Sequence, residues 1–418
     1  MPNGQTRLGR SGKDRKMESS GLIDYINWRG DLTFTASPFN DVDNAILCEL
    51  CYLDLTPVFS EGQDSSVTLR RAYQIIQQSN SFHMMSPLGD NEEFVAAAAE
   101  SRRFGDIIMS DYLDSLDFRS TQFSAVHFHL NSTLNYIAFR GTDDSLIGWK
   151  EDLMMSFENV PAQKSALDYL RRTMKDGISY YVGGHSKGAN LAIYAVAFLP
   201  EERRNQVKRV FANDGPGFSP LVHDMKRIEE IVPKITRIIP YFDVIGQIFY
   251  MEIPDTKIVN SEGSGLLQHD LMTWKVKGSK FSLAKNTDPS VPLIRSALDH
   301  WIKSSDMKAR KAFVDVLFAN LTANGEEHVD EIRLRRLPQV ISGLLMSGEE
   351  AKQVALNLPK SALESAKTQL EDVLTRYMQD EIEKHQEKQE RTRQESEKAQ
   401  KEKARREEMR NRRKEGRK

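Results

Sequence analysis

The sequence has very little cysteine: only 2 of its 418 residues, Cys48 and Cys51, are cysteines. That number excludes the disulfide framework of small secreted domains, and no second C-x-x-C pair is present to complete a zinc site. A thioredoxin-like redox site would place C-x-x-C at the start of a helix after a strand. Here the pair lies inside the amphipathic helical pattern of residues 43–53. We therefore predict two buried thiols that pack in a core.

Long hydrophobic runs and a large net charge are also missing. The longest apolar run falls well short of the roughly 20 residues that a membrane-spanning helix needs. Residues 1–20 are polar and basic without an apolar stretch, unlike a secretory signal peptide. The formal net charge is −2, which does not suit a molecule that binds polyanions with its whole surface. We expect a soluble, cytoplasmic protein without a transmembrane segment.

The chain is long enough to bury a large core and a second region, because 39% of its 418 residues are hydrophobic. Helical patterns extend from residue 21 to about Ser115, and residues 123–130 and 134–139 are typical of a β-hairpin. Strands then alternate with helices to about Val276. This alternation predicts an α/β domain over residues 21–290, with a mostly parallel sheet covered by helices on both faces.

Two histidines in the predicted hairpin, His127 and His129, alternate onto one face of their strand. A metal site would need a third ligand, and the sequence offers no obvious one. We therefore predict a solvated strand face at this position, and we expect no metal or other cofactor in the protein.

A G-x-S-x-G motif, Gly184-His185-Ser186-Lys187-Gly188, separates a strand-like run from a helix-like run. A serine nucleophile needs a tight turn that holds its hydroxyl off the sheet edge, and the glycines let strand and helix backbones approach each other. The N-terminus of the following helix favours negative charge near the serine. The motif in this context predicts a nucleophile elbow with Ser186 as the nucleophile.

An activated serine needs a histidine base, which in α/β-hydrolases follows the serine and the acid along the chain. His269 suits this role because it lies in a glycine-containing loop before the strand-like residues 271–276. The other histidines after Ser186 lie too early or in helix-like and charged stretches: His223, His300, His328 and His385.

Two aspartates qualify as the acid that orients this histidine, because each follows a predicted strand at its carboxyl end. Asp243 lies just past the strand-like residues 234–240, and Asp214 ends the strand-like residues 209–213. We favour Asp243, since the acid of this fold usually follows the later strand. Asp214 is the alternative, and it could instead be a turn residue that bonds its own backbone.

The oxyanion of an acyl-transfer reaction needs backbone donors. The first is the N–H of the residue after the nucleophile, Lys187. The second is expected from the loop after an earlier strand, and residues 135–139 form a strand pattern that ends in Arg140-Gly141-Thr142. Thr142 offers both its N–H and its hydroxyl.

These motifs resemble those of class 3 lipases, in the run from Ala138 to Thr142, in the elbow and in Asn213-Asp214-Gly215-Pro216-Gly217. From about residue 21 to the mid-370s the chain more closely resembles the Mbeg-like proteins, a bacterial domain-of-unknown-function family placed among α/β-hydrolases. The segments that carry this likeness are Leu22-Ile23-Asp24-Tyr25-Ile26, Phe39-Asn40-Asp41-Val42-Asp43-Asn44, Val160-Pro161-Ala162-Gln163, the elbow and Gln268-His269-Asp270.

The resemblance implies a serine-hydrolase scaffold with Ser186, His269 and Asp243 as the triad, and with Thr142 and Lys187 as the oxyanion hole. The chain departs from the family pattern at Ala189, where glycine is usual. The acid position varies within the family, so the resemblance leaves Asp214 open.

Beyond residue 290 the sequence pattern becomes helical, and we expect a helical extension over residues 291–375. From residue 376 onward nearly every side chain is charged or amide, without a heptad seam, which predicts a charged helical or disordered tail. The tail ends in a basic cluster. Solubilisation is its simplest role, and a weak anionic partner, RNA or acidic lipid, is the alternative. Residues 1–20 we expect to be disordered.

Taken together, the motifs predict an α/β-hydrolase-fold serine hydrolase that cleaves a carboxylic ester. Its substrate would be a small-molecule or lipid ester, as for a lipase, lysophospholipase or esterase. A thioesterase or amidase would use the same residues. The alternative from another class is a catalytically silent interaction or scaffold protein that has kept the fold.

Overall fold

The computed structural model of the chain describes residues 21–59, 66–86, 91–117, 121–142, 161–220, 222–289, 291–292 and 295. These residues all belong to the first of two compact units, which ends at Asn357. The predictions for residues 1–20, for most of the extension over 291–375 and for the tail over 376–418 lie outside the described residues. Within the described part of the chain, no helix is long and apolar enough to cross a membrane.

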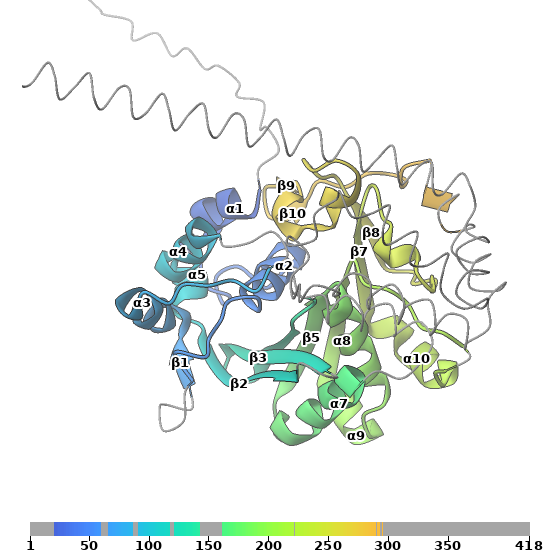
Figure 1. Cartoon of the computed structure of the whole chain (residues 1–418), viewed down its shortest axis with the longest axis horizontal. Coiled ribbons are helices and arrows are strands. Elements are labelled where there is room, and N and C mark those ends of the chain that lie inside the picture. Colours follow the sequence, from blue (N-terminus) through green and yellow to red (C-terminus); the bar gives the residue numbers. More distant parts are fainter. Residues whose placement is uncertain are drawn as a thin grey trace, which may run out of the picture. The chain divides into compact units, whose positions relative to one another are not determined.

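An eight-stranded sheet forms the centre of this unit (Figure 1). Its strands lie side by side in the order of the sequence: β1 (Ser66–Thr68), β2 (Ile108–Asp117), β3 (Thr121–Asn131), β4 (Leu134–Phe139), β5 (Ser179–His185), β6 (Val207–Asn213), β7 (Ile235–Pro240) and β8 (Thr256–Val259). The strands from β1 to β4 pair antiparallel. Those from β4 to β8 pair parallel. The predicted hairpin and the mostly parallel sheet are confirmed.

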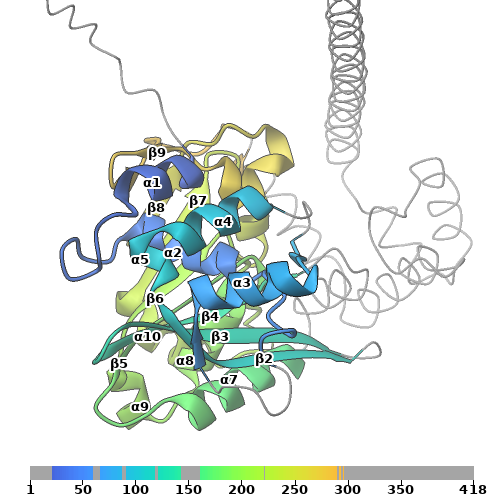
Figure 2. The ribbon, with the colours of Figure 1, turned by 90° about the vertical axis from the view of Figure 1, so that its left-hand side faces the viewer.

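Helices cover both faces of the sheet, as Figures 1 and 2 show. The first face carries α1 (Leu22–Arg29), α2 (Asp41–Leu50), α3 (Leu69–Ser79), α4 (Glu92–Glu100) and α5 (Arg102–Gly105). The second face carries α7 (Pro161–Thr173), α8 (Lys187–Ala197) and α10 (Met225–Ile231), and the short α9 (Glu201–Gln206) follows α8.

A hydrophobic core lies on each face of the sheet, and strand β4 contributes side chains to both of them. Tyr136 and Ala138 pack in the core under α1–α5, whereas Ile137 and Phe139 pack in the core under α7 and α8. Successive side chains of a strand point to opposite faces, so a strand that is covered on both sides is apolar throughout.

The structure differs from the sequence prediction at two segments. The helical pattern expected up to about Ser115 is wrong at its end, because Ile108–Asp117 form β2, which pairs with β3 and bulges between Ser110 and Leu113. This pairing overrides a weak local helix preference. The strand expected at residues 271–276 is also largely wrong, because the Asp270 carboxylate accepts a hydrogen bond from Met272 N and starts a 3-10 turn there. Only the short β9 (Val276–Lys277) follows, paired with β10 (Lys280–Phe281).

His127 and His129 do not form the predicted solvated face. His127 is buried under α7, where Nε2 lies 3.0 Å from Thr173 Oγ1, and burial lowers its pKa to about 4. His129 contacts the Ser110 hydroxyl at 2.8 Å. The long helix α7 covers this strand face, which the hairpin sequence alone did not reveal. Among the described residues, no group of histidine, cysteine and acidic side chains could hold a metal ion.

The prediction for the two cysteines is confirmed, since Cys48 and Cys51 are free and fully buried. The thiol of Cys48 lies 3.1 Å from the Tyr136 hydroxyl, and Asn213 Nδ2 donates to the same sulfur at 3.2 Å. These contacts fasten α2 to the central strands β4 and β6.

Candidate active site

Ser186 forms a sharp turn between β5 and α8, in the predicted strand–turn–helix context. Its backbone has φ 57° and ψ −127°, a conformation that costs a non-glycine residue about 1–3 kcal/mol. The backbone N–H of Ser186 donates to the Asn213 carbonyl at 3.0 Å, which ties the turn to the end of β6. The serine is half-buried, so the fold holds it at the sheet edge with access to solvent.

The glycines of the elbow are required by close backbone contacts. A Cβ atom on Gly184 would lie 2.3 Å from the carbonyl carbon of Gly188. A Cβ atom on Gly188 would lie 2.2 Å from the Phe139 carbonyl oxygen. Both distances are too short for any side chain, so the motif lets β4, β5 and the first turn of α8 meet around the serine.

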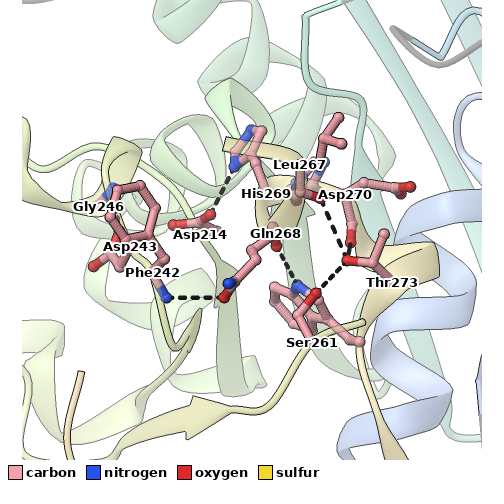
Figure 3. Close-up of polar contacts among 12 residues, drawn as sticks. Asp214, Phe242, Asp243, Gly246, Ser261, Leu267, Gln268, His269, Asp270 and Thr273 are labelled. Atoms are coloured by element: carbon pink, nitrogen blue, oxygen red, sulfur yellow. Dashed lines mark hydrogen bonds and ion pairs between the residues drawn. The ribbon is translucent and has the colours of Figure 1, made fainter. Parts of the chain in front are cut away.

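His269 lies at the end of a 3-10 turn (Gly265–His269) and faces Asp214 (Figure 3). The Nδ1 atom of His269 is 2.7 Å from Oδ2 of Asp214, whose side chain is only 1% exposed. Burial alone would raise the pKa of Asp214, but the charge of His269 and its hydrogen bond hold that pKa below the usual value. Asp214 is therefore a buried carboxylate, and Nδ1 carries the imidazole proton.

Asp243, the acid that the sequence analysis favoured, binds elsewhere. Its Oδ1 accepts from Gly246 N at 2.7 Å, and its Oδ2 accepts from Gln247 Nε2 at 2.6 Å. Burial and the nearby charge of Asp214 raise the pKa of Asp243 well above its ordinary value. In the structure His269 is therefore paired with Asp214, the alternative acid of the sequence analysis, whereas the carboxyl group of Asp243 closes the loop after β7.

The backbone explains why the earlier strand supplies the contact. Asp214 also has a positive φ, 44°, and its N–H donates to the Ile238 carbonyl on β7 at 2.8 Å. This left-handed turn directs the side chain off the strand end toward His269. Asp–Gly–Pro–Gly was interpreted as turn chemistry in the sequence, and that turn is what presents the carboxylate.

His185 contacts the 3-10 turn that carries His269. Its Nε2 lies 2.8 Å from the His269 carbonyl oxygen, and the two imidazole rings are 4.5 Å apart between centroids. Burial lowers the pKa of His185 to about 3, so the ring is neutral. A carbonyl can only accept, so the proton is on Nε2, and Nδ1 accepts from the Tyr52 hydroxyl at 3.0 Å.

Tyr52 is a site residue that the sequence analysis missed. It follows the last turn of α2, far from the motif in sequence, and its hydroxyl is the atom closest to where a Cβ on Gly141 would lie. The sequence contained no signal for this contact, because an aromatic residue after an amphipathic helix normally packs in the core.

The backbone next to one of the expected oxyanion donors, Thr142, lies close to Ser186. A Cβ atom on Gly141 would be 3.2 Å from Ser186 Cβ, so the residue just before Thr142 packs against Ser186. Lys187 directly follows Ser186 and is the first residue of α8. Arg140 anchors the end of β4 through two 3.0 Å hydrogen bonds to the carboxylate of Asp114.

Several solved lipases are similar to this chain at low identity. Lipase II from Rhizopus niveus is 13% identical, with 66% of this chain and 92% of that chain covered and a TM-score of 0.34. The Rhizomucor miehei lipase in its native propeptide complex is 13% identical, with 66% and 78% covered and a TM-score of 0.33. The M37 lipase is 13% identical, with 50% and 69% covered and a TM-score of 0.29. No curated protein sequence matches the chain.

The sheet order, the elbow between β5 and α8 and the helices on both faces form an α/β-hydrolase fold. The sequence model of a family described as Mbeg1-like matches residues 98–319, which is 222 of the 418 residues. The matched segment contains Ser186, Asp214 and His269. The chain therefore belongs to the Mbeg1-like family.

Proposed function

We propose that the protein is a serine hydrolase that cleaves a carboxylic ester through Ser186, His269 and Asp214. The observation that carries this proposal is the 2.7 Å contact between His269 Nδ1 and the buried carboxylate of Asp214. It lies at the carboxyl ends of the central strands, where Ser186 has a positive φ. A buried carboxylate at Nδ1 fixes the tautomer in which Nε2 is free to accept a proton.

In the first half-reaction the hydroxyl of Ser186 attacks the acyl carbon and His269 Nε2 takes its proton. Asp214 then stabilises the imidazolium that has formed. The N–H groups of Lys187 and Thr142 bind the negative oxygen of the tetrahedral intermediate. His269 returns the proton to the leaving alkoxide as the carbon–oxygen bond breaks, which leaves an acyl-serine. Water, deprotonated by His269, releases the carboxylic acid by the same steps.

The substrate that we propose is a small-molecule or lipid ester, as in lipases, lysophospholipases and esterases. A thioester or an amide would pass through the same tetrahedral intermediate. A panel of p-nitrophenyl esters, lysolipids, acyl-thioesters and anilides separates these classes by the ratio of their kcat/KM values.

A fluorophosphonate probe tests the proposal, because it reacts only with an activated serine. We expect the purified protein to label at Ser186 and labelling to disappear in Ser186→Ala and in His269→Ala. Ser79→Ala, which removes an exposed hydroxyl on α3, and His83→Ala, which removes an exposed imidazole, are the matched controls and should label normally. A wild-type protein that folds but does not label would identify a catalytically silent scaffold instead.

A further inference from the structure

A second carboxyl group lies behind the Asp214–His269 pair, and the mechanism above does not use it. Asp243 is fully buried, and it follows β7, the strand that pairs with β6 next to Asp214. Figure 3 shows Asp214 between His269 on one side and Asp243 on the other. Asp214 and Asp243 thus follow two neighbouring parallel strands, and His269 faces Asp214 from the 3-10 turn.

The two oxygens of Asp214 have different surroundings. Oδ2 contacts His269, whereas the buried Oδ1 has no donor among the described residues when both aspartates are ionised. The side chains of Asp214 and Asp243 nevertheless lie within hydrogen-bonding reach of each other. Two carboxylates cannot share a hydrogen bond, so one member of the pair has to carry a proton.

The neighbouring groups decide which member carries it. Asp214 contacts His269 Nδ1 through Oδ2, and the charge and hydrogen bond of His269 favour the charged form of Asp214. Asp243 has Arg237 at 3.5 Å, but Asp214 opposes its ionisation. The NH2 group of Arg237 also donates to the Gly246 carbonyl, so this cation is shared with the loop backbone. Burial alone would raise the pKa of both aspartates. The pKa of Asp214 is nevertheless lowered, against the effect of burial, whereas the pKa of Asp243 is raised, in the same direction as burial.

We propose that Asp243 is held as a neutral carboxylic acid whose O–H donates to Oδ1 of Asp214, so that a carboxyl–carboxylate pair supports His269. Asp243 is then a positioning residue. Its hydrogen bond satisfies Oδ1, fixes the rotamer of Asp214 and presents Oδ2 to the imidazole. No bond is made or broken at Asp243 during turnover. The role in turnover rests on the proposed hydrolase function, whereas the protonation state does not.

Asp243→Asn is the informative variant, because the amide is neutral and keeps an N–H donor in place of the O–H. The titration of His269 is followed by NMR of its ring carbon, which requires no turnover. If Asp243 is neutral, Asp243→Asn should leave the His269 pKa within about 0.3 units of wild type, and the fluorophosphonate labelling rate should change by less than about threefold.

If Asp243 were ionised, the same substitution would remove a negative charge next to the triad. The His269 pKa would then fall by about one unit or more, and that result would overturn the proposal. The matched variant Asp243→Leu has similar volume but no donor. It should lower the labelling rate by about 10–100-fold, since Oδ1 of Asp214 loses its partner. Equal labelling rates for Asp243→Leu and Asp243→Asn would refute the positioning role.

Infrared spectroscopy gives a measurement that is independent of how well the variants fold or react. The wild-type protein should show a protonated carboxyl band at neutral pH that is absent from Asp243→Asn. A wild-type protein without that band would contradict the proposal. A wild-type protein that has the band but does not label with the probe would refute the hydrolase function alone.

Discussion

The turn after β6 and the loop after β7 present the same residue type at the same edge of the sheet, yet they use it differently. The turn holds Asp214 at positive φ with its carboxylate against His269. The loop directs the carboxyl group of Asp243 onto its own backbone at Gly246. Strand order alone therefore does not assign the acid of an α/β-hydrolase. The hydrogen-bond partners do, because they decide which carboxyl group is charged.

The two regions are also physically joined. Gly217 N donates to the Ile248 carbonyl at 2.8 Å, and Phe249 has the strained φ of 49°. A backbone hydrogen bond thus joins the turn after β6 to the loop after β7.

The largest effect should come from the residues that act on the serine as a unit. His269→Ala should lower ester hydrolysis by about 10⁴–10⁶-fold. In that background Asp214→Asn should cost almost nothing further, since Asp214 acts only through the imidazole. A double-mutant cycle on kcat measures this. Additive losses would mean that Asp214 has a role apart from His269.

Gly217→Ala should break the contact between the two regions. A Cβ atom there would lie 1.7 Å from the Phe249 carbonyl oxygen, so the loop has to move away. We expect a loss of about 1–3 kcal/mol in the free energy of unfolding, together with slower probe labelling. The control is Gly21→Ala, where the nearest atom would be 3.9 Å away. Denaturant unfolding of the two variants checks the difference, and equal stability would contradict the packing account.

The opposite pKa shifts of the two aspartates should give opposite pH dependences of stability. The lowered pKa of Asp214 means that its carboxylate stabilises the fold above the unfolded value of about 3.9, and that this is lost as the pH falls through the folded pKa. The raised pKa of Asp243 means that the folded state retains a proton that the unfolded chain has released. Its cost therefore grows as the pH rises above about 4.

These signs predict two trends in melting temperature relative to wild type. Asp243→Asn should gain about 2–5 °C between pH 4.5 and 8, whereas Asp214→Asn should lose stability as the pH rises from about 3 to 5. Asp168→Asn, with a side chain 55% exposed on α7, is the control for removal of a surface charge. Parallel trends for the two buried variants would show that both aspartates are in the same protonation state.

The smallest effect is expected at Tyr52, which contacts His185 next to the turn of His269. Tyr52→Phe removes the hydroxyl that donates to His185 Nδ1 but keeps the ring. We expect about a tenfold slower labelling and a stability loss of roughly 1 kcal/mol, because a buried imidazole nitrogen loses its partner. Tyr73→Phe, which removes a hydroxyl bound to Glu92 on the helical layer, should leave labelling unchanged. Equal labelling rates in the two variants would remove Tyr52 from the site.

The sequence predicted the parts of the site that depend on local chemistry. Close backbone contacts around Ser186 require glycines, and the serine turn has to follow a strand, so both features can be recognised in the local sequence. The glycine-containing loop of His269 can be recognised in the same way. The choice between Asp214 and Asp243 was not predictable in this way. It depends on a backbone turn with positive φ and on which carboxyl group remains charged once both are buried. Tyr52 was missed for a similar reason, since its partner His185 lies 133 residues along the chain.

We propose that Asp214, and not Asp243, is the charged partner of His269. The most direct test is the rate of fluorophosphonate labelling at Ser186 in Asp214→Asn and Asp243→Asn, measured side by side on folded protein. We predict a loss of about 10⁴-fold for Asp214→Asn, by analogy with the corresponding substitution in the serine-protease triad, and a rate near wild type for Asp243→Asn. The reverse ranking would contradict the account and return the acid to the loop after β7.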